Sequence, residues 1–310
     1  MRYTLRQLEY FIAAGEVGSI TLASERLCIS QPSISTAISH LEREFGVQLF
    51  VRHHAQGLSL TPAGHKILAE AKRVVQQAEG LYAAACEVTE QIRGQISVGS
   101  MVTLAPMIMP ELAHNFMKTF PETEIRQFAA DQGWLLGRLR HAEIDVAITY
   151  DLQIPEGVSF FALAELPAHA VVSDAHPLAH KPSVTLAELA QEPLILLDLP
   201  LSLEYFFALF FNEGLQPRIH SRSSHQDVVR TMVANGYGYT LANVRPRSDC
   251  ALDGRRIVRV PISGNHRPMV IGTATLANIK KSRLVEAFEQ HCRESISSQY
   301  IPGMDALFSK

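Results

Sequence analysis

Hydrophobic residues near the start of the chain recur at helical spacing, in short blocks separated by polar or glycine positions. Leu5, Leu8 and Ile12 share one face of a first helix, because positions three and four apart lie together on an α-helix. The same pattern predicts a second helix over residues 21–27 and a third over residues 31–45. Helices this short gain most of their stability from packing, so we expect their apolar faces to be buried against one another.

The third helix carries the most information about function. Ser30 suits the N-cap, Pro32 fits the first turn, and Gly46 provides a stop at the other end. An apolar stripe that starts at Ile34 faces inward. The opposite face is made mostly of small hydroxyl-bearing residues and ends in a basic one, which suits close approach to a DNA groove and its phosphates. The residues of this helix and its cap that we predict to contact DNA are Ser30, Gln31, Pro32, Ser33, Ser35, Thr36, Ser39, His40 and Arg43.

A strand, a turn and a second strand are predicted over residues 48–60, and they complete a winged helix-turn-helix domain over residues 1–60. Arg52 and His53 lie near the tip of this wing, and we predict that they contact DNA as well. Residues 1–65 hold five arginines and five glutamates, so non-specific affinity for DNA is expected to be modest. The alternative interpretation is a generic helical bundle.

Residues 61–92 are predicted to form one long linker helix, which Thr61 and Pro62 open. Apolar residues along it alternate steps of four and three, as in a coiled coil. A symmetric DNA reader needs two heads, so we predict that this helix dimerises with that of a second chain. The alternative is that it packs on its own domain. The apolar seam consists of Ile67, Ala71, Val74, Ala78, Leu81, Ala85, Val88 and Ile92.

From residue 93 onward, short β-rich runs alternate with helical stretches, a pattern that predicts parallel sheets with helical crossovers. Two such halves, crossed twice by the chain, give a two-lobed α/β fold like that of periplasmic binding proteins. We place lobe I at residues 93–163 plus 267–300 and lobe II at residues 164–266, which together form an effector-binding domain over residues 93–300. Residues 301–310 are expected to be a loosely docked C-terminal tail.

In such a fold a ligand binds between the lobes, at the carboxyl ends of the strands. The helix that opens near Thr103 offers free N–H groups to an anion, so a carboxylate-bearing effector is favoured. Asp131 and Asp198 leave room for an amino group, so amino-acid-like compounds are included. For each position, an ordinary turn or cap is the alternative. The predicted effector-binding residues are Ser100, Met101, Val102, Thr103, Asp131, Thr149, Tyr150, Asp198, Ser202, His225 and Asn243.

Composition narrows the class of protein. The 310 residues are 47% hydrophobic and 19% charged, with a net charge of −3, so the case for DNA binding depends on local pattern. Charged residues interrupt the N-terminal segment, unlike a signal peptide, and no run approaches the roughly 18 apolar residues of a membrane span. We therefore expect a cytoplasmic protein with no membrane contact. An exported solute-binding protein is the alternative that shares the lobed fold.

The sequence contains no recognisable catalytic, cofactor or metal motif. There is no GxSxG, GxxxxGK[ST] or GxGxxG segment. His176 and His180 are four residues apart, but Pro177 breaks any helix that could hold a metal between them. We therefore predict no enzymatic activity, no metal and no cofactor. The dispersed cysteines indicate reduced thiols, with a redox pair of Cys250 and Cys292 as the alternative.

The head resembles that of LysR-type transcriptional regulators, and the resemblance continues more loosely through the C-terminal domain. It implies binding to an interrupted inverted repeat in promoter DNA, a small-molecule effector, and homodimers that assemble into homotetramers. RNA polymerase is a candidate further partner. At Thr36 the chain departs from the family pattern, in which many members carry arginine. The matching positions include Ala23, Leu27, Gln31, Pro32, Ser35, Leu41, Glu42, Gly46, Leu49, Phe50, Arg52, the run Leu60-Thr61-Pro62-Ala63-Gly64, the Asp145-Val-Ala-Ile strand, and the turns 176–179 and 233–238.

Overall fold

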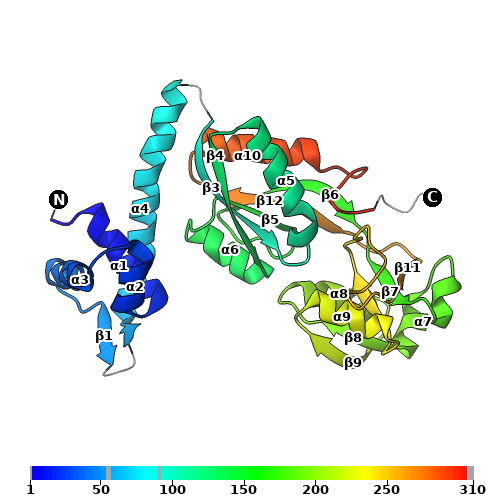
Figure 1. Ribbon diagram of the computed structural model, residues 1–310. Helices are drawn as coiled ribbons and strands as arrows, with labels where there is room; N and C mark the ends of the chain where they lie inside the picture. The colour runs from blue at the N-terminus through cyan, green and yellow to red at the C-terminus, as the bar shows by residue number, and fades with distance from the viewer. Residues whose placement is uncertain (1, 54–56, 90–91, 306–310) are drawn as a thin grey trace. The chain divides into compact units, whose positions relative to one another are not determined.

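The structure is a computed structural model that describes residues 2–53, 57–89 and 92–305. The chain divides into two compact units (Figure 1). The first comprises Met1–Gln91 with His141–Glu143, and the second comprises Ile92–Arg140 with Ile144–Lys310. The fold is the expected one, a helix-turn-helix head with a wing, a long helix, and a two-lobed α/β domain.

The head begins with helices α1 (Leu5–Val17), α2 (Ile20–Leu27) and α3 (Gln31–Phe45). Their boundaries follow from local chemistry. Thr4 and Gln7 form a capping box at the start of α1, and Gly18 and Gly46 adopt left-handed conformations that end α1 and α3. The apolar faces meet in a core in which Phe11, Ile34 and Leu41 are fully buried.

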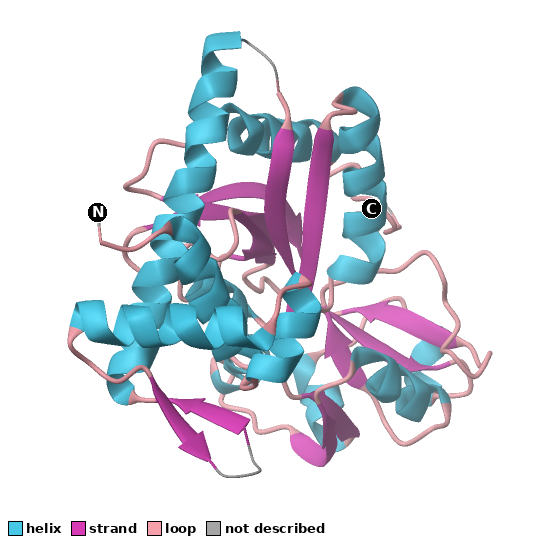
Figure 2. Ribbon diagram, turned by 60° about the vertical axis from the view of Figure 1, so that its left-hand side comes forward, coloured by secondary structure: helices cyan, strands magenta, loops and turns pink. Residues whose placement is uncertain are grey.

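The wing is a hairpin of β1 (Phe50–His53) and β2 (Gly57–Leu60), paired antiparallel with Phe50 opposite Leu60 (Figure 2). Glu42 of α3 attaches the base of the wing to that helix. Its Oε1 accepts hydrogen bonds from the Leu49 N–H at 2.8 Å and the Phe50 N–H at 3.3 Å. The Leu41-Glu42 match to the LysR pattern therefore has a structural reason, because Glu42 fixes the wing relative to α3.

The entry into helix α4 (Pro62–Thr89) is equally constrained. The Thr61 hydroxyl accepts from the Gly64 N–H at 2.8 Å and donates to the Gln48 carbonyl at 2.7 Å. A Cβ placed on Gly64 would lie 2.1 Å from the Leu49 carbonyl oxygen. Only glycine allows the two backbone segments to come this close. The Thr-Pro-Ala-Gly run therefore packs the start of α4 directly against the base of the wing.

The first part of the predicted apolar seam packs within the head. Ala71 is buried and Ile67 half-buried in the core of the head, where α4 packs on α1. Helix α4 ends at Thr89, and Ile92 packs instead into the core of the second unit. Apolar residues at alternating steps of four and three occur on the inner face of any packed helix, and they occur in coiled coils as well. The side chains of Leu81, Ala85 and Val88 lie outside the described residues.

Lobe I of the second unit is built on a mixed sheet with strand order β4-β3-β5-β12-β6. Strand β3 runs parallel to β4 and β5, whereas β12 is antiparallel to β5 and β6. Helices α5 and α10 pack together on one face and α6 covers the other (Figure 1). The elements are β3 (Gly94–Met101), α5 (Ala105–Thr119), β4 (Thr123–Ala130), α6 (Gln132–Arg140), β5 (Val146–Tyr150), β6 (Val158–Leu166), β12 (Met269–Leu276) and α10 (Arg283–Ser295).

Two features explain how the lobe I sheet is packed. Gly99 of β3 leaves space for Leu135 of α6, because a Cβ there would lie 2.5 Å from the leucine side chain. Asp145 joins β3 to the start of β5: its carboxylate accepts from the Ser97 N–H at 2.8 Å, and its own N–H donates to the Ser97 carbonyl. The Asp145-Val-Ala-Ile segment of the family pattern is thus a sheet clamp followed by a fully buried strand.

Lobe II contains a sheet of order β10-β7-β11 and the parallel pair β8-β9, which an isolated bridge between Leu194 and Tyr239 connects. Gly238, at φ +144°, lies so close to the Pro193 carbonyl that any side chain would collide with it. The elements are β7 (His169–Ser173), the 3₁₀ turn Pro177–His180, α7 (Leu186–Gln191), β8 (Pro193–Leu197), α8 (Ser202–Phe211), β9 (Arg218–Ser223), α9 (Gln226–Ala234), β10 (Thr240–Ala242) and β11 (Ile257–Pro261).

The lobe boundary lies slightly later than residue 163. Strand β6 pairs with β12 as far as Leu166, opposite Met269, so the first crossover follows Leu166. Strand β6 itself was not predicted from the sequence. Buried and exposed residues do not alternate regularly along it, so it gives only a weak strand pattern.

The C-terminal tail is not loosely docked over the part that the structure describes. Ile301 and Met304 are buried in the lobe I core, and Met304 forms a backbone bridge with Pro246. The Asp305 carboxylate accepts from the Arg259 guanidinium of lobe II at 2.6 Å. Two apolar side chains separated by a short turn were too weak a signal to predict this. Residues 306–310 lie outside the described part.

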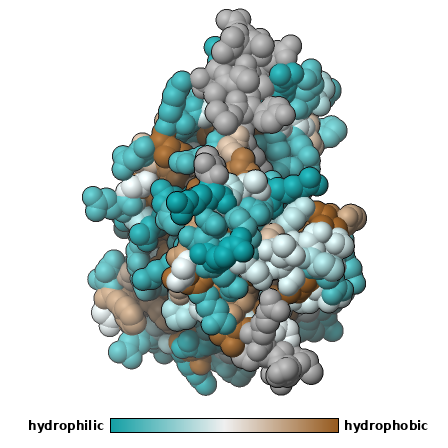
Figure 3. All heavy atoms as spheres, turned by 90° about the vertical axis from the view of Figure 1, so that its left-hand side faces the viewer, coloured by the Kyte–Doolittle hydropathy of each residue, from teal (hydrophilic) through white to brown (hydrophobic). Residues whose placement is uncertain are grey.

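The face of the molecule in Figure 3 is mostly hydrophilic, with hydrophobic residues in small separate areas. Within the described residues, we find no helix with the length and hydropathy required to span a membrane.

We expect Gly64→Ala to lower the free energy of unfolding of the head by about 2–3 kcal/mol, because the new methyl group forces Leu49 and the wing to move. Gly137→Ala is the control, since a Cβ there meets nothing within 4 Å in the middle of α6. It should be neutral or stabilising by about 0.5–1 kcal/mol. Urea unfolding measures both. Equal stability of the Gly64→Ala variant and the wild type would contradict the close approach.

Ending the chain after Tyr300 should destabilise the second unit by about 3 kcal/mol, since it removes the buried side chains of Ile301 and Met304. A chain that ends after Asp305 is the control and should unfold like the full-length protein. Thermal unfolding compares the three. If both shortened chains melt together with the full chain, the docking of residues 301–305 contributes nothing to stability.

Candidate functional site

The predicted DNA-contacting face of α3 is open to solvent. Ser35 and His40 are half-buried at its edges, and the Ser30 and Ser33 hydroxyls share a hydrogen bond of 2.8 Å. The remaining members of the predicted set on this helix are exposed: Gln31, Pro32, Ser33, Thr36, Ser39 and Arg43.

The electrostatics of this face suit a polyanion. The Glu42 carboxylate accepts hydrogen bonds from the base of the wing, and Glu44 is half-buried. Among the predicted DNA-contacting residues of α3, the formal charge therefore comes from Arg43, which is exposed. Arg52 and His53 lie on β1 opposite Leu58 and Gly57, and their side chains are outside the described residues. The arrangement permits close contact with a phosphate backbone without like-charge repulsion.

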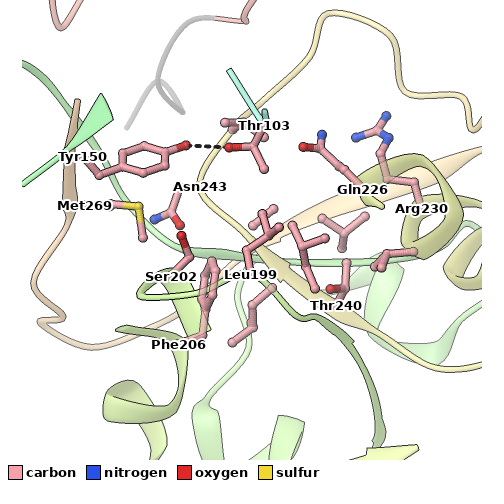
Figure 4. Close-up of a pocket in the computed structure, with 16 residues that line it drawn as sticks. Thr103, Tyr150, Leu199, Ser202, Phe206, Gln226, Arg230, Thr240, Asn243 and Met269 are labelled. Carbon is pink, nitrogen blue, oxygen red and sulfur yellow. Dashed lines mark hydrogen bonds between the residues drawn. The ribbon is translucent and has the colours of Figure 1, made fainter. Parts of the chain in front are cut away.

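A second candidate site is a cavity between the two lobes of the second unit, of about 550 Å³ including its opening to solvent (Figure 4). Lobe I contributes Thr103, Tyr150 and Met269, and lobe II contributes most of the remaining wall. Among the predicted effector-binding residues, those that line it are Thr103, Tyr150, Ser202 and Asn243.

The other predicted residues that follow lobe I strands do not line this cavity. The Ser100 hydroxyl and the Met101 side chain are buried in lobe I, and Val102 is exposed. Asp131 caps α6 by accepting from the Trp134 N–H at 3.0 Å. Thr149 is fully buried and donates to the Gln132 amide oxygen at 3.0 Å.

The remaining two predicted residues belong to the surface of lobe II. Asp198 lies 3.7 Å from the Arg222 guanidinium, and His225 is exposed at the N-cap of α9. Strand-end position therefore pointed to the part of the unit where the cavity lies, but it did not distinguish side chains that face the cavity from those that face the lobe core or solvent.

Tyr150 is held firmly at the lobe I side. Its hydroxyl lies 3.2 Å from the Thr103 hydroxyl (Figure 4), and burial raises the pKa of the phenol, which stays protonated. The buried Gln132 amide donates to the Tyr150 carbonyl at 3.1 Å and to the Leu152 carbonyl. Gln132 thereby fixes the end of β5 from beneath, and it positions Tyr150 without lining the cavity.

Asn243 lies where the chain passes between the lobes. Its amide donates to the Leu166 carbonyl at 2.7 Å and lies 3.4 Å from the Tyr205 hydroxyl. Tyr205 in turn donates to the Arg267 carbonyl at 2.8 Å. Leu166 and Arg267 belong to the two crossovers, so this network joins the cavity wall to both connections between the lobes.

Gln226 and Arg230 also line the cavity, although neither was predicted from the sequence. They lie one turn apart on α9, so they share one face of that helix, but no signal in the sequence shows that this face borders the cavity. The Ser202 hydroxyl and the Gln226 amide oxygen are buried and have no hydrogen-bond partner among the described residues. Buried polar atoms of this kind are rare in proteins and suggest that a bound molecule satisfies them.

The structure does not bring the two cysteines of the possible redox pair together. Cys292 is buried in the lobe I core, where burial raises the pKa of its thiol, whereas Cys250 is exposed on lobe II. Within the described ranges, no group of three or more His, Cys, Asp or Glu side chains is arranged to hold a metal ion.

Comparisons with known proteins identify two domains in the chain. The family model of the bacterial regulatory helix-turn-helix protein, lysR family, matches residues 5–65, and that of the LysR substrate binding domain matches residues 89–297. The chain is 33% identical over 230 residues to the HTH-type transcriptional regulator CysB of Burkholderia cenocepacia, covering 71% of each protein. It is 28% identical to the uncharacterized HTH-type transcriptional regulator YybE of Bacillus subtilis, covering 92% of this chain and 96% of that one.

Among solved structures, the chain resembles HinK, a LysR family transcriptional regulator from Pseudomonas aeruginosa, with 35% identity and a TM-score of 0.65 over 95% of this chain and 99% of that one. The substrate-binding-domain model alone matches more than half of the sequence. The chain therefore belongs to the LysR family of DNA-binding transcriptional regulators.

Proposed function

We propose that this regulator reads an interrupted inverted repeat in promoter DNA through α3 and the wing, and that a small effector bound in the interlobe cavity controls this binding. The exposed, nearly uncharged face of α3 carries the first half of the proposal. Small hydroxyl side chains allow the helix to lie deep in the major groove, and the phosphate contacts that we propose are from Arg43, which is exposed, and from Arg52 and His53 of the wing.

The interlobe cavity supports the second half of the proposal, the control by an effector. Its wall is largely apolar, with a few polar groups of which the Ser202 hydroxyl and the Gln226 amide oxygen lack partners. Ligand sites typically have this composition. The effector class we propose is a small carboxylate or amino-acid-like metabolite, and Thr103, Tyr150, Ser202 and Asn243 are its proposed contacts.

The effector would act by changing the angle between the lobes. Thr103 and Tyr150 lie on one lobe and Ser202 on the other, so a ligand that contacts all three binds one interlobe angle better than others. In a homotetramer of this chain, such a change would alter the spacing of the DNA-reading heads. The exposed Val74 on α4, 37% accessible, leaves an apolar position free for pairing between chains.

Thr36→Glu should weaken promoter binding at least about tenfold, because it places a negative charge against the DNA phosphates. Gln77→Glu is the control, since it adds the same charge at an exposed position of α4. Fluorescence anisotropy with a promoter fragment at fixed salt compares the two with the wild type. Undiminished binding by Thr36→Glu would refute the assignment of α3 as the DNA-reading helix.

Ser202→Ala should weaken effector binding about tenfold while leaving the unliganded protein as stable as the wild type, because the lost hydroxyl has no partner in the described structure. The measurement is a thermal-shift screen of the full chain against amino acids, aromatic acids and small carboxylates, followed by promoter binding with each stabilising compound. Ser224→Ala, exposed on lobe II, is the control. A panel in which no compound both stabilises the protein through Ser202 and alters promoter binding would contradict the effector site.

A further inference from the structure

The cavity wall has an asymmetric charge. Among the described residues that line it, Arg230 is charged and there is no carboxylate. The sequence suggested that Asp131 and Asp198 could face an amino group of the ligand, but Asp131 caps α6 and Asp198 lies beside Arg222. The cavity wall therefore offers a charged partner to an anion, and among the described residues it offers no carboxylate to an ammonium group.

Arg230 is buried without a close counter-ion. It is 9% exposed, and its guanidinium donates to the carbonyls of Ser248 at 3.2 Å and Cys250 at 3.4 Å. Both acceptors are neutral, and within the described part of the chain no carboxylate lies within ion-pair distance of this guanidinium. Asp227, exposed in the first turn of α9, acts on it only at longer range. A buried cation in this situation is costly, and an anion beside it would lower that cost.

The surroundings of Arg230 are also cationic. His169 is fully buried nearby, and its pKa is lowered to about 3, first by burial and then by the charges of Arg245, Arg259 and Arg230. Asp305 forms an ion pair with Arg259 at 2.6 Å and so offsets one of these charges. The lobe II side of the cavity thus has a positive potential that favours a negatively charged ligand.

Gln226 and Ser202 complete an anion-binding set. Gln226 precedes Arg230 by one helical turn, and the two side chains lie next to each other at the cavity wall in Figure 4. The Gln226 NH2 group can donate to an anion at the guanidinium, while its amide oxygen, which can only accept, stays without a partner among the described residues. Ser202, which is 6% exposed, has a hydroxyl without a partner among the described residues and can donate from the α8 side.

We propose that the effector is a small monocarboxylate with an apolar body and no ammonium group, and that its carboxylate pairs with Arg230 beside Gln226. The body would lie against apolar wall residues such as Leu199, Phe206, Val229 and Met269. This inference rests on the proposed function, because it takes the cavity to be the effector site. It goes further by excluding amino acids from the class that the sequence suggested.

The probes are two matched series that differ in one group at a time: 3-phenylpropanoate, 3-phenylpropanamide and phenylalanine, and 4-methylpentanoate, 4-methylpentanamide and leucine. Titration calorimetry with the full chain measures their affinities. We expect at least one acid to bind, and its amide and amino acid to bind at least about tenfold more weakly, because only the acid pairs with Arg230 without carrying an ammonium group. Equal or tighter binding of the amide or amino acid, or binding of neither acid, would overturn the proposal.

Two variants test whether the carboxylate of the ligand binds beside Arg230. Gln226→Glu places a carboxylate one turn from Arg230, so it should raise the melting temperature of the unliganded protein and reduce the affinity for the acid at least about tenfold. Arg230→Gln should reduce that affinity similarly, whereas Arg255→Gln, at an exposed site of lobe II, should not. If Arg230→Gln fails to fold, Gln226→Glu still decides the question. Unchanged acid affinity in Gln226→Glu would exclude pairing with Arg230.

The two proposals fail in different ways. An effector that depends on Ser202 and controls promoter binding, but is cationic, neutral or zwitterionic, would leave the cavity as the effector site and refute the anion assignment. An acid that binds through Arg230 without changing promoter binding would support the anion site and refute its regulatory role.

Discussion

The second unit depends on one pairing of strands at the boundary between its lobes. Strands β6 and β12 run antiparallel, and Leu166 stands opposite Met269 at the point where each strand meets lobe II. Because both crossovers lie side by side, the lobes remain joined at one edge and a cavity can form between them. Asn243 and Tyr205 donate to the carbonyls of Leu166 and Arg267, so hydrogen bonds connect the cavity wall to both crossovers.

The polar groups of the cavity are divided between two kinds of environment. On the lobe I side, Tyr150, Thr103 and Gln132 satisfy one another through a connected set of hydrogen bonds. On the lobe II side, Ser202 and Gln226 have atoms without partners in the described structure, and Arg230 has only neutral acceptors. The polar groups of the lobe I wall are thus already hydrogen-bonded, whereas those of the lobe II wall lack some of their partners. This is the arrangement expected if a ligand supplies the missing contacts.

The head is held together by close backbone contacts at a few defined points. Glu42 joins α3 to the wing, and Gly64 allows α4 to start directly against the Leu49 carbonyl. These contacts hold the recognition helix, the wing and the linker helix as one body. The exposed face of α3 is then free to carry small polar side chains, because none of them is needed to hold the head together.

The sequence alone determined the architecture. Helical spacing, caps and glycine stops indicated α1 and placed α2 and α3 to within a residue, and the alternation of strands and helices indicated two α/β lobes, because these signals are local and repeat along the chain. Strand ends also indicated the correct region for the cavity. Only the tertiary structure decided which side chains face it. Thr149 and Tyr150 are neighbours, yet one points into the lobe core and the other toward the cavity. The contributions of Gln226 and Arg230, the docking of residues 301–305 and the burial of Ala71 against α1 likewise depend on contacts between segments far apart in the sequence, which no local pattern encodes.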